Sequence, residues 1–309
     1  MIGYFVILIL VITLLYFIVS DNQPKLAVVK YGHVVDGFNT KSLVVRDERI
    51  IKSPLSGTFY PLCKEGKRLS YGQPVARLKN EEKGSTTLYN KMSGIVSFSV
   101  DGLENKITPG SINKININEF YDINRNYKHL SQHVFIRKNE YVYRVINNYN
   151  MYLVIKTSQT EAERYRINET VFARDLEFDS NKLIEAKITN IIEQNKKALI
   201  VLKLDRFISR WLDVRWVDIE FIKNIFRGRV IPANSVIGTA EGKKVIVSDS
   251  DSDYKLKKID VKYSGKNQTV MEGIEVGTNV VIDPAKYNIT TGGNNNEKEK
   301  IKKTSKRGQ

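Results

Sequence analysis

The chain has 309 residues and a formal net charge of +15 at pH 7, with 41% hydrophobic and 27% charged residues. This balance excludes a disordered chain, a collagen-like chain and a membrane protein with many spans. The single cysteine, Cys63, excludes an internal disulfide and any zinc or iron–sulfur site that needs several cysteines. The length is sufficient for several small domains.

An uninterrupted apolar segment runs from Ile2 to Ser20 and contains no charged residue. Its length matches the roughly 20 residues that a helix needs to cross a bilayer. No basic region precedes it and no small-residue cleavage site follows it, so residues 1–21 are predicted to be a retained transmembrane anchor. The charges leave the orientation open, because Lys25 and Lys30 follow the segment and argue weakly against export of the rest.

After the anchor, short apolar runs are separated by Gly, Pro, Asn and Asp at intervals of about ten residues. This pattern predicts an all-β chain. Few windows have a helical period, and the best of them, residues 161–166 and 205–212, are short. The polar residues 291–309 predict a disordered basic tail, either simply solvated or in contact with anionic lipid, wall polymer or nucleic acid.

An internal repeat relates residues 52–59 (KSPLSGTF) to residues 90–98 (NKMSGIVSF). Each copy has an apolar residue, then Ser-Gly, then a β-prone strand. Gly57 and Gly94 fall where a strand must bend or approach another backbone closely, which a side chain would obstruct. Two such half-units that pair with each other predict one small flattened barrel.

The residues around this repeat resemble a known family. SPLSGTFYPLCKEGKRLSYGQPVARL and MSGIVSFSVDGLE resemble the split biotinyl/lipoyl-like domain of HlyD-type membrane fusion proteins, the periplasmic adaptors of transport systems. Farther along, RVIPANSVI and VMEGIEVGTNVVIDP resemble the membrane-proximal end of the same adaptors. The motif residues that carry the resemblance are Pro54, Gly57, Gly66, Gly72, Gly94, Gly102, Pro232, Gly273, Gly277 and Pro284.

The resemblance implies a mainly β fold and a non-enzymatic adaptor without cofactor, metal or nucleic acid. Its β domains would lie outside the cytoplasmic membrane, link an inner-membrane transporter or another envelope complex, and be able to form homo-oligomers. The implied domains follow the anchor as a biotinyl/lipoyl-like domain with flanking strands (22–118), a linker (119–133), a β-barrel domain (134–228), a membrane-proximal β domain (229–290) and the tail (291–309).

The chain departs from the family at the insertion between the two lipoyl halves. Typical adaptors carry a long helical hairpin there, which reaches toward a channel partner, whereas residues 79–88 (KNEEKGSTTL) predict only a turn-rich loop. The short loop favours an envelope without an outer membrane, and it leaves a scaffold of the envelope or division machinery as an alternative. A lipoyl- or biotin-like carrier would modify Lys79 or Lys83, but neither has the sequence setting that modifying enzymes read.

Two local patterns give further expectations. Asp101-Gly102 is a strong signal for a two-residue hairpin. Residues 211–222 (WLDVRWVDIEFI) alternate in two short runs with a slip between Trp216 and Val217, which predicts a bulged strand.

Other chemical motifs are weak. Residues 238–244 are one residue short of a P-loop and predict a hairpin, and residues 248–254 lack the glycine of a calcium loop and predict a polar turn. Residues 111–114 match Ser-x-x-Lys without the Lys-Thr-Gly that should follow. The remaining candidates are His129 and His133, four apart as on one helix face but without a third ligand, and Cys63, which has no nearby histidine and is expected to be a small buried apolar residue.

Overall fold

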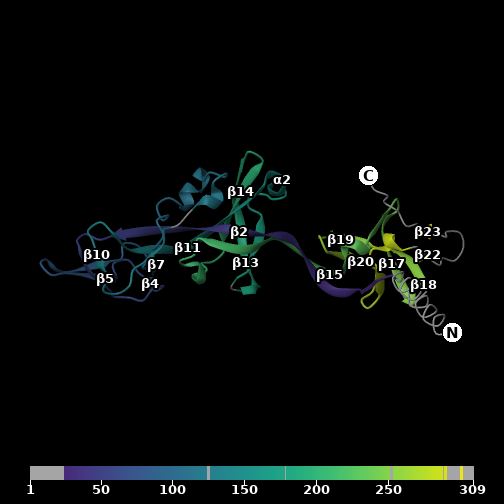
Figure 1. Cartoon of the computed structure of the whole chain (residues 1–309), viewed down its shortest axis with the longest axis horizontal. Helices are drawn as coiled ribbons and strands as arrows, with labels where there is room; N and C mark the ends of the chain where they lie inside the picture. The colour runs from purple at the N-terminus through teal and green to yellow at the C-terminus, as the bar shows by residue number, and fades with distance from the viewer. Residues whose placement is uncertain are drawn as a thin grey trace, which may run out of the picture. The chain divides into compact units, whose positions relative to one another are not determined.

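The computed structural model describes residues 24–123, 126–177, 179–250, 253–287, 289–290 and 300–301. The chain divides into two compact units, one formed by Gly37–Lys223 and the other by Met1–Asp36 with Asn224–Gln309. Both are mainly β, as the sequence predicts (Figure 1). The predicted anchor and most of the predicted tail lie outside the described residues. Within the described part, no helix is long and apolar enough to cross a membrane.

The first part of the larger unit is a sandwich of two sheets around one core. Phe59, Leu78, Val96 and Val145 are among the buried side chains between them. The four-stranded sheet has the order β10 (Phe135–Ile136), β3 (Gly57–Pro61), β5 (Pro74–Asn80) and β6 (Gly84–Tyr89), and the facing layer contains β4 (Arg68–Leu69), β7 (Gly94–Ser97), the start of β11 (Tyr141–Ser158) and the end of β2 (Lys30–Lys52).

The two copies of the repeat lie in different sheets of this sandwich. Strand β3 of the first copy pairs with β5 and β10, whereas β7 of the second copy pairs with β4 and β11. The copies meet through Phe59 and Phe98, whose ring centroids are 5.4 Å apart, and not through hydrogen bonds between their strands. The half-units nevertheless pair with each other, as predicted, because β4, in the continuation of the first copy, pairs with β7 of the second.

The second part of the larger unit is a closed β-barrel. Its ring closes because β2 pairs with both β11 and β15. The core contains Leu153, Ile200, Trp211 and Phe221, and α2 (Gln159–Ala162) packs against β14. Around the ring from β2 and β11 the strands are β14 (Lys197–Leu204), β13 (Asp179–Gln194), β12 (Thr170–Asp175) and β15 (Trp216–Pro232), with η3 (Ser209–Trp211) before β15.

Strands β2 and β11 run through both parts as one antiparallel ribbon. Residues 141–146 pair with 48–52 in the sandwich, and residues 151–155 pair with 42–46 in the barrel. The register shifts between these stretches, at residues 147–150. The two parts are thus joined by continuous strands and not by a flexible linker.

The segment after β8 (Ser99–Val100) differs from expectation. Strand β8 pairs with β9 (Lys128–His129), and the chain after Asp101 turns into η1 (Pro109–Lys114) and η2 (Phe120–Asp122). Ile112 and Phe120 of this segment pack on Leu43 and Val154 of the ribbon. The predicted hairpin at Asp101-Gly102 is wrong, because the Asp101 side chain is buried in an ion-pair cluster.

The predicted bulge between Trp216 and Val217 falls at the first two residues of a strand. Strand β15 begins at Trp216, and its pairing with β12 over residues 219–222 has no register shift. The residues before it form η3 and a loop in which Trp211 enters the barrel core. The slip in the alternation marks the start of the strand.

The smaller unit contains its own β core, with Val29, Ile231, Val245 and Met271 among its buried residues. The hairpin predicted within residues 238–244 is the β16–β17 hairpin. The elements are β1 (Leu26–Val28), η4 (Ala233–Ser235), β16 (Ile237–Thr239), β17 (Gly242–Ser250), β18 (Asp253–Lys258), β19 (Asp260–Ser264), β20 (Gln268–Glu272), β21 (Asn279–Val281), η5 (Pro284–Lys286), β22 (Ile289–Thr290) and β23 (Lys300–Ile301).

We expect Gly94→Ala to lower the free energy of unfolding by about 1–3 kcal/mol. A Cβ atom at Gly94 would collide with the Ile146 carbonyl oxygen and lie 2.9 Å from Cγ1 of Val145. Gly110→Ala is the matched control, because nothing lies within 4 Å of a Cβ atom there. Denaturant unfolding measures both variants, and equal midpoints would contradict the close approach at Gly94.

Candidate functional site

Six ionisable side chains are buried together where the ribbon passes from the sandwich into the barrel. They come from three places in the chain: the ribbon, the turn after β8 and the loop before β15. Three are arginines and three are carboxylates, so their formal charges cancel. They are Arg46, Glu48, Asp101, Glu104, Arg144 and Arg215, which we call the ionic junction.

Arg215 is the centre of the ionic junction. Its Nε lies 2.5 Å from Oδ2 of Asp101 and its Nη2 lies 3.1 Å from Oδ1 of the same carboxylate. Its Nη2 also donates to Glu48. A bidentate contact between guanidinium and carboxylate fixes both planes and is among the strongest hydrogen-bonded pairs in proteins.

Arg144 extends the network toward the surface. Its Nη1 lies 3.1 Å from Oε2 of Glu48 and 3.6 Å from Oε1 of Glu104. Its Nη2 lies 2.7 Å from Oδ1 of Asp213, a partly exposed carboxylate that also accepts from Ser97 Oγ at 2.8 Å. Charged groups from four segments are thereby joined through a single guanidinium.

The arginines also hold the loop at residues 211–215. Arg46 Nη1 donates to the carbonyl oxygens of Trp211 and Val214, both at 2.7 Å, and Arg144 Nη2 donates to that of Leu212 at 3.0 Å. The Trp211 indole donates to Asp175 Oδ2 at 2.8 Å. Three main-chain carbonyls of this stretch, those of Trp211, Leu212 and Val214, thus accept from arginine side chains.

Burial and neighbouring charges oppose each other in the ionic junction. Burial alone would raise the pKa of Asp101, but the hydrogen bond and charge of Arg215 outweigh it, so the pKa lies below its ordinary value. Burial, together with Arg215 and Arg144, lowers the pKa of Arg46 to about 9 despite the attraction of Glu48. Asp101 and Arg46 therefore both stay charged near neutral pH.

The ionic junction is suited to positioning the segments that contribute to it. Each of its six side chains is almost completely shielded from solvent. Its charges bond to one another and to main-chain carbonyls. What it can do is fix the ribbon, the turn after β8 and the start of β15 relative to one another.

The predicted motif residues do not gather in one site. Six lie within Gly37–Lys223 and four within the other unit. A Cβ atom at Gly57 would lie 2.7 Å from the Lys79 carbonyl oxygen, and Pro54 and Gly72 line a groove beside β6. The others lie at turns or element ends: Gly66, Gly94, Gly102, Pro232, Gly273, Gly277 and Pro284.

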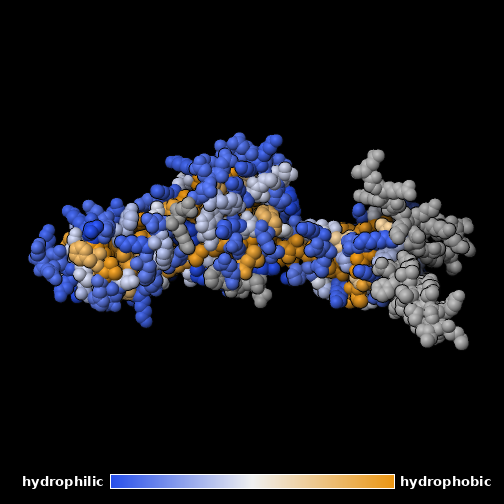
Figure 2. All heavy atoms as spheres, in the orientation of Figure 1, coloured by the Kyte–Doolittle hydropathy of each residue, from blue (hydrophilic) through white to orange (hydrophobic). Residues whose placement is uncertain are grey.

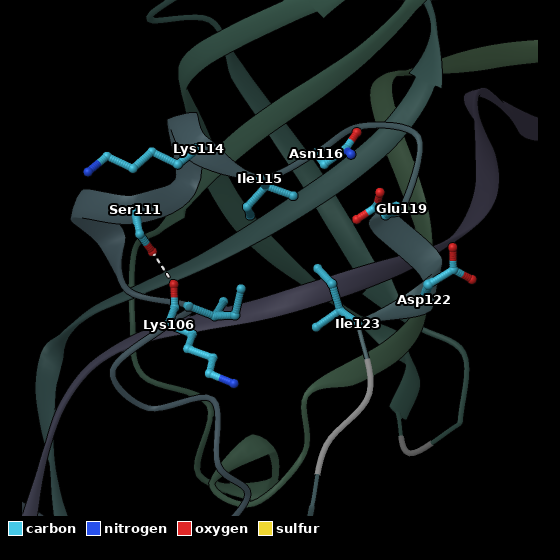
Figure 3. Close-up of a pocket in the computed structure, with 9 residues that line it drawn as sticks. Lys106, Ser111, Lys114, Ile115, Asn116, Glu119, Asp122 and Ile123 are labelled. Atoms are coloured by element: carbon cyan, nitrogen blue, oxygen red, sulfur yellow. Dashed lines mark hydrogen bonds between the residues drawn. The ribbon is translucent and has the colours of Figure 1, made fainter.

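A hollow of about 510 Å³ lies beside η1 and η2 (Figure 3). Ile115 and Ile123 point into it. Ser111 Oγ donates to the Lys106 carbonyl oxygen at 2.6 Å, and the Lys114 side chain points away from Ser111. The Ser-x-x-Lys pattern therefore does not place a hydroxyl nucleophile against a lysine base.

The histidines occupy no helix. His129 lies in β9, with Nδ1 2.9 Å from Ser99 Oγ, and His133 lies in a turn at a φ of 67°. They therefore cannot present the shared helix face that a metal would need. Among the described residues, no group of His, Cys, Asp or Glu side chains is arranged to hold a metal ion.

The insertion between the lipoyl halves is a β-hairpin. Lys79 lies in β5, Lys83 lies in the turn, and β5 pairs with β6 down to Asn80 and Gly84. Residues 62–93, all described, contain no helix. Cys63 is half-buried against the sandwich core, where burial raises the pKa of its thiol.

The comparisons with known proteins agree with this architecture. Residues 48–147 match the family described as "RND related, barrel-sandwich hybrid domain", and residues 151–225 match "RND related, beta-barrel domain". The two matches meet where the ribbon shifts register, and together they cover more than half of the chain. The chain belongs to the membrane fusion, or adaptor, protein family.

No curated protein sequence matches the chain. Three solved structures to which the chain is similar can be compared with it by sequence identity, TM-score and coverage. MacA from Actinobacillus actinomycetemcomitans has 12% identity and a TM-score of 0.39, with 83% of this chain and 98% of that chain covered. ZneB from Cupriavidus metallidurans has 9% identity and a TM-score of 0.35, with 89% of this chain and 94% of that chain covered. The membrane fusion protein Spr0693 from Streptococcus pneumoniae R6 has 8% identity and a TM-score of 0.34, with 60% of this chain and 100% of that chain covered. Similarities of this size define neither an activity nor a partner.

We expect Glu48→Gln to lower the free energy of unfolding by about 3–5 kcal/mol. The substitution leaves Arg215 and Arg144 buried without their shared carboxylate. Asp205→Asn is the control, because Asp205 and Arg206 pair on the surface with 42% and 45% of their side chains exposed. Its cost should stay below about 1 kcal/mol. Denaturant unfolding measures both variants, and a similar decrease in the free energy of unfolding in both would contradict a buried cluster.

The Asp101 carboxylate should make stability depend on pH. Because its pKa is lower in the folded chain than in the unfolded chain, its contribution is present above the unfolded pKa and is lost as pH falls through the folded pKa. Unfolding measured from pH 7 down to about 2 should therefore show a shallower loss in Asp101→Asn than in the unmodified chain. If the free energy of unfolding fell with pH equally in Asp101→Asn and in the unmodified chain, the ion pair between Asp101 and Arg215 would be contradicted.

Proposed function

We propose that the chain is a non-enzymatic, membrane-anchored adaptor that links an inner-membrane transporter to other components of the cell envelope. The observation that carries the proposal is the pair of consecutive adaptor-type domains at residues 48–147 and 151–225. Their strands are continuous and the ionic junction lies where they meet. A protein that positions other proteins needs this kind of fixed coupling between its own domains.

The anchor and the orientation belong to the same proposal. The apolar segment Ile2–Ser20 would hold the chain in the cell membrane as a single span, with the β domains on the extracytoplasmic side. Support for this orientation comes from the family to which the chain belongs. Homo-oligomers would form through these β domains.

The short β5–β6 hairpin limits how far the adaptor can reach. A three-residue turn, Glu81 to Lys83, separates the two strands. A helical hairpin would extend by about 1.5 Å per residue, and this chain has none within residues 62–93. We infer that its partner lies close to the cell membrane.

Crosslinking in the native host, followed by capture of the tagged full-length chain and mass spectrometry, tests the function. We expect a transporter of the cell membrane among the captured proteins, and a variant without residues 2–20 should lose both the transporter and the membrane fraction. Capture of division or wall-synthesis proteins alone would overturn the proposal in favour of an envelope scaffold.

A further inference from the structure

Strand β6 is an unprotected sheet edge. It ends the order β10-β3-β5-β6 and pairs only with β5 among the described residues. Its sequence, GSTTLY, contains no charged residue and no proline. Natural sheets usually protect an edge with lysine, proline or a cover, because its free N–H and C=O groups can pair with another chain.

A groove of about 400 Å³ follows this edge. Its lining includes Thr86 to Lys91, from β6 and the residues after it, and Ile51, Lys52 and Pro54, at and just after the end of β2. The turn at Gly72 is fixed at one end by two main-chain bonds with Asn90, Gly72 N to Asn90 O and Asn90 N to Gln73 O, both 2.8 Å. The groove is therefore formed by main chain that is already held in place.

The groove has a definite chemical character. Its only ionisable side chains besides tyrosines are Lys52 and Lys91, and no carboxylate lines it. Tyr71 and Tyr89, which line the groove, are 74% and 54% exposed, so their rings are accessible to a ligand. Aromatic side chains with a polar tip and paired cations are suited to an extended segment that carries negative charge.

We propose that the β6 edge binds an extended acidic segment of another protein, which adds to the sheet as a further strand. Main-chain hydrogen bonds to β6 would supply affinity, and Lys52 and Lys91 would select negatively charged side chains. A second copy of this chain fits less well, because each copy carries a net charge of +15 and the groove itself is cationic. The proposal goes beyond the adaptor function, since it needs neither a transporter nor the anchor.

The probe is a dye-labelled peptide with blocked ends, in which Glu and Val alternate over about eight residues. Fluorescence anisotropy measures its binding to the full-length chain in detergent. A matching peptide with Lys in place of Glu should bind at least tenfold more weakly, and binding of the Glu peptide should weaken as salt is added.

Two N-methylated forms of the Glu peptide test strand addition directly. In a strand, alternate N–H groups face one side, so methylation of one set blocks pairing with β6 and methylation of the other set does not. We expect one form to lose binding more than tenfold and the other to stay within about threefold of the parent peptide. Equal binding by both forms would overturn the proposed mode.

Charge variants locate the site. Lys52→Glu with Lys91→Glu should weaken the Glu peptide about fivefold to tenfold. The matched control is Lys41→Glu with Lys138→Glu, which makes the same change in net charge at exposed positions outside the groove. If both pairs of substitutions weakened binding of the Glu peptide equally, the proposed site would be wrong. It would also be wrong if sedimentation showed that the chain forms a dimer which the peptide dissociates, because a second copy would then occupy the β6 edge. The adaptor function is tested separately, because capture of a transporter does not depend on whether the peptide binds.

Discussion

Three arginines and three carboxylates, buried together where the barrel-sandwich meets the β-barrel, determine how these two domains are joined. Removing such charges from water costs free energy that only close, complementary pairing offsets. In the observed arrangement Arg215, from the loop before β15, and Glu48, from β2, are buried against each other. The ionic junction therefore contributes less to total stability than to the selection of one geometry. The polar surface over the larger unit, seen in Figure 2, gives no comparable constraint.

The ribbon of β2 and β11 explains why the ionic junction can act in this way. Arg46 and Glu48 lie on one strand of the ribbon and Arg144 on the other, so main-chain pairing places half of the cluster before any side chain is oriented. The 211–215 loop then receives its bonds from Arg46 and Arg144, and β15 begins directly after it. Domain geometry and the start of β15 consequently depend on the same few guanidinium groups. An adaptor that holds its partners at fixed positions needs its own domains to be fixed relative to one another in this way.

The sequence alone predicts the mainly β fold and the hairpin within residues 238–244, because these follow from local alternation and from Gly, and its ordered motifs carry the adaptor resemblance. It does not reveal the ionic junction. Arg144 stands inside an apolar run, YVYRVI, which is a signal for a buried charge, but its carboxylate partners Glu48 and Glu104 lie far away in sequence. The Asp101-Gly102 dipeptide predicts a hairpin from local preference alone. That preference is overridden because the Asp101 side chain pairs with Arg215, more than a hundred residues away.

The pairing of β2 with β11 also has a consequence for how the chain is made. The two strands are about 100 residues apart, and a ribosome adds about 5–20 residues per second, so β2 waits about 5–20 seconds for its partner. During that interval its long, partly apolar edge is open to pairing with the wrong strand. Contacts between such distant residues also make folding slow once the chain is complete. Biogenesis of this protein therefore depends on keeping one early strand unpaired until the middle of the chain has emerged.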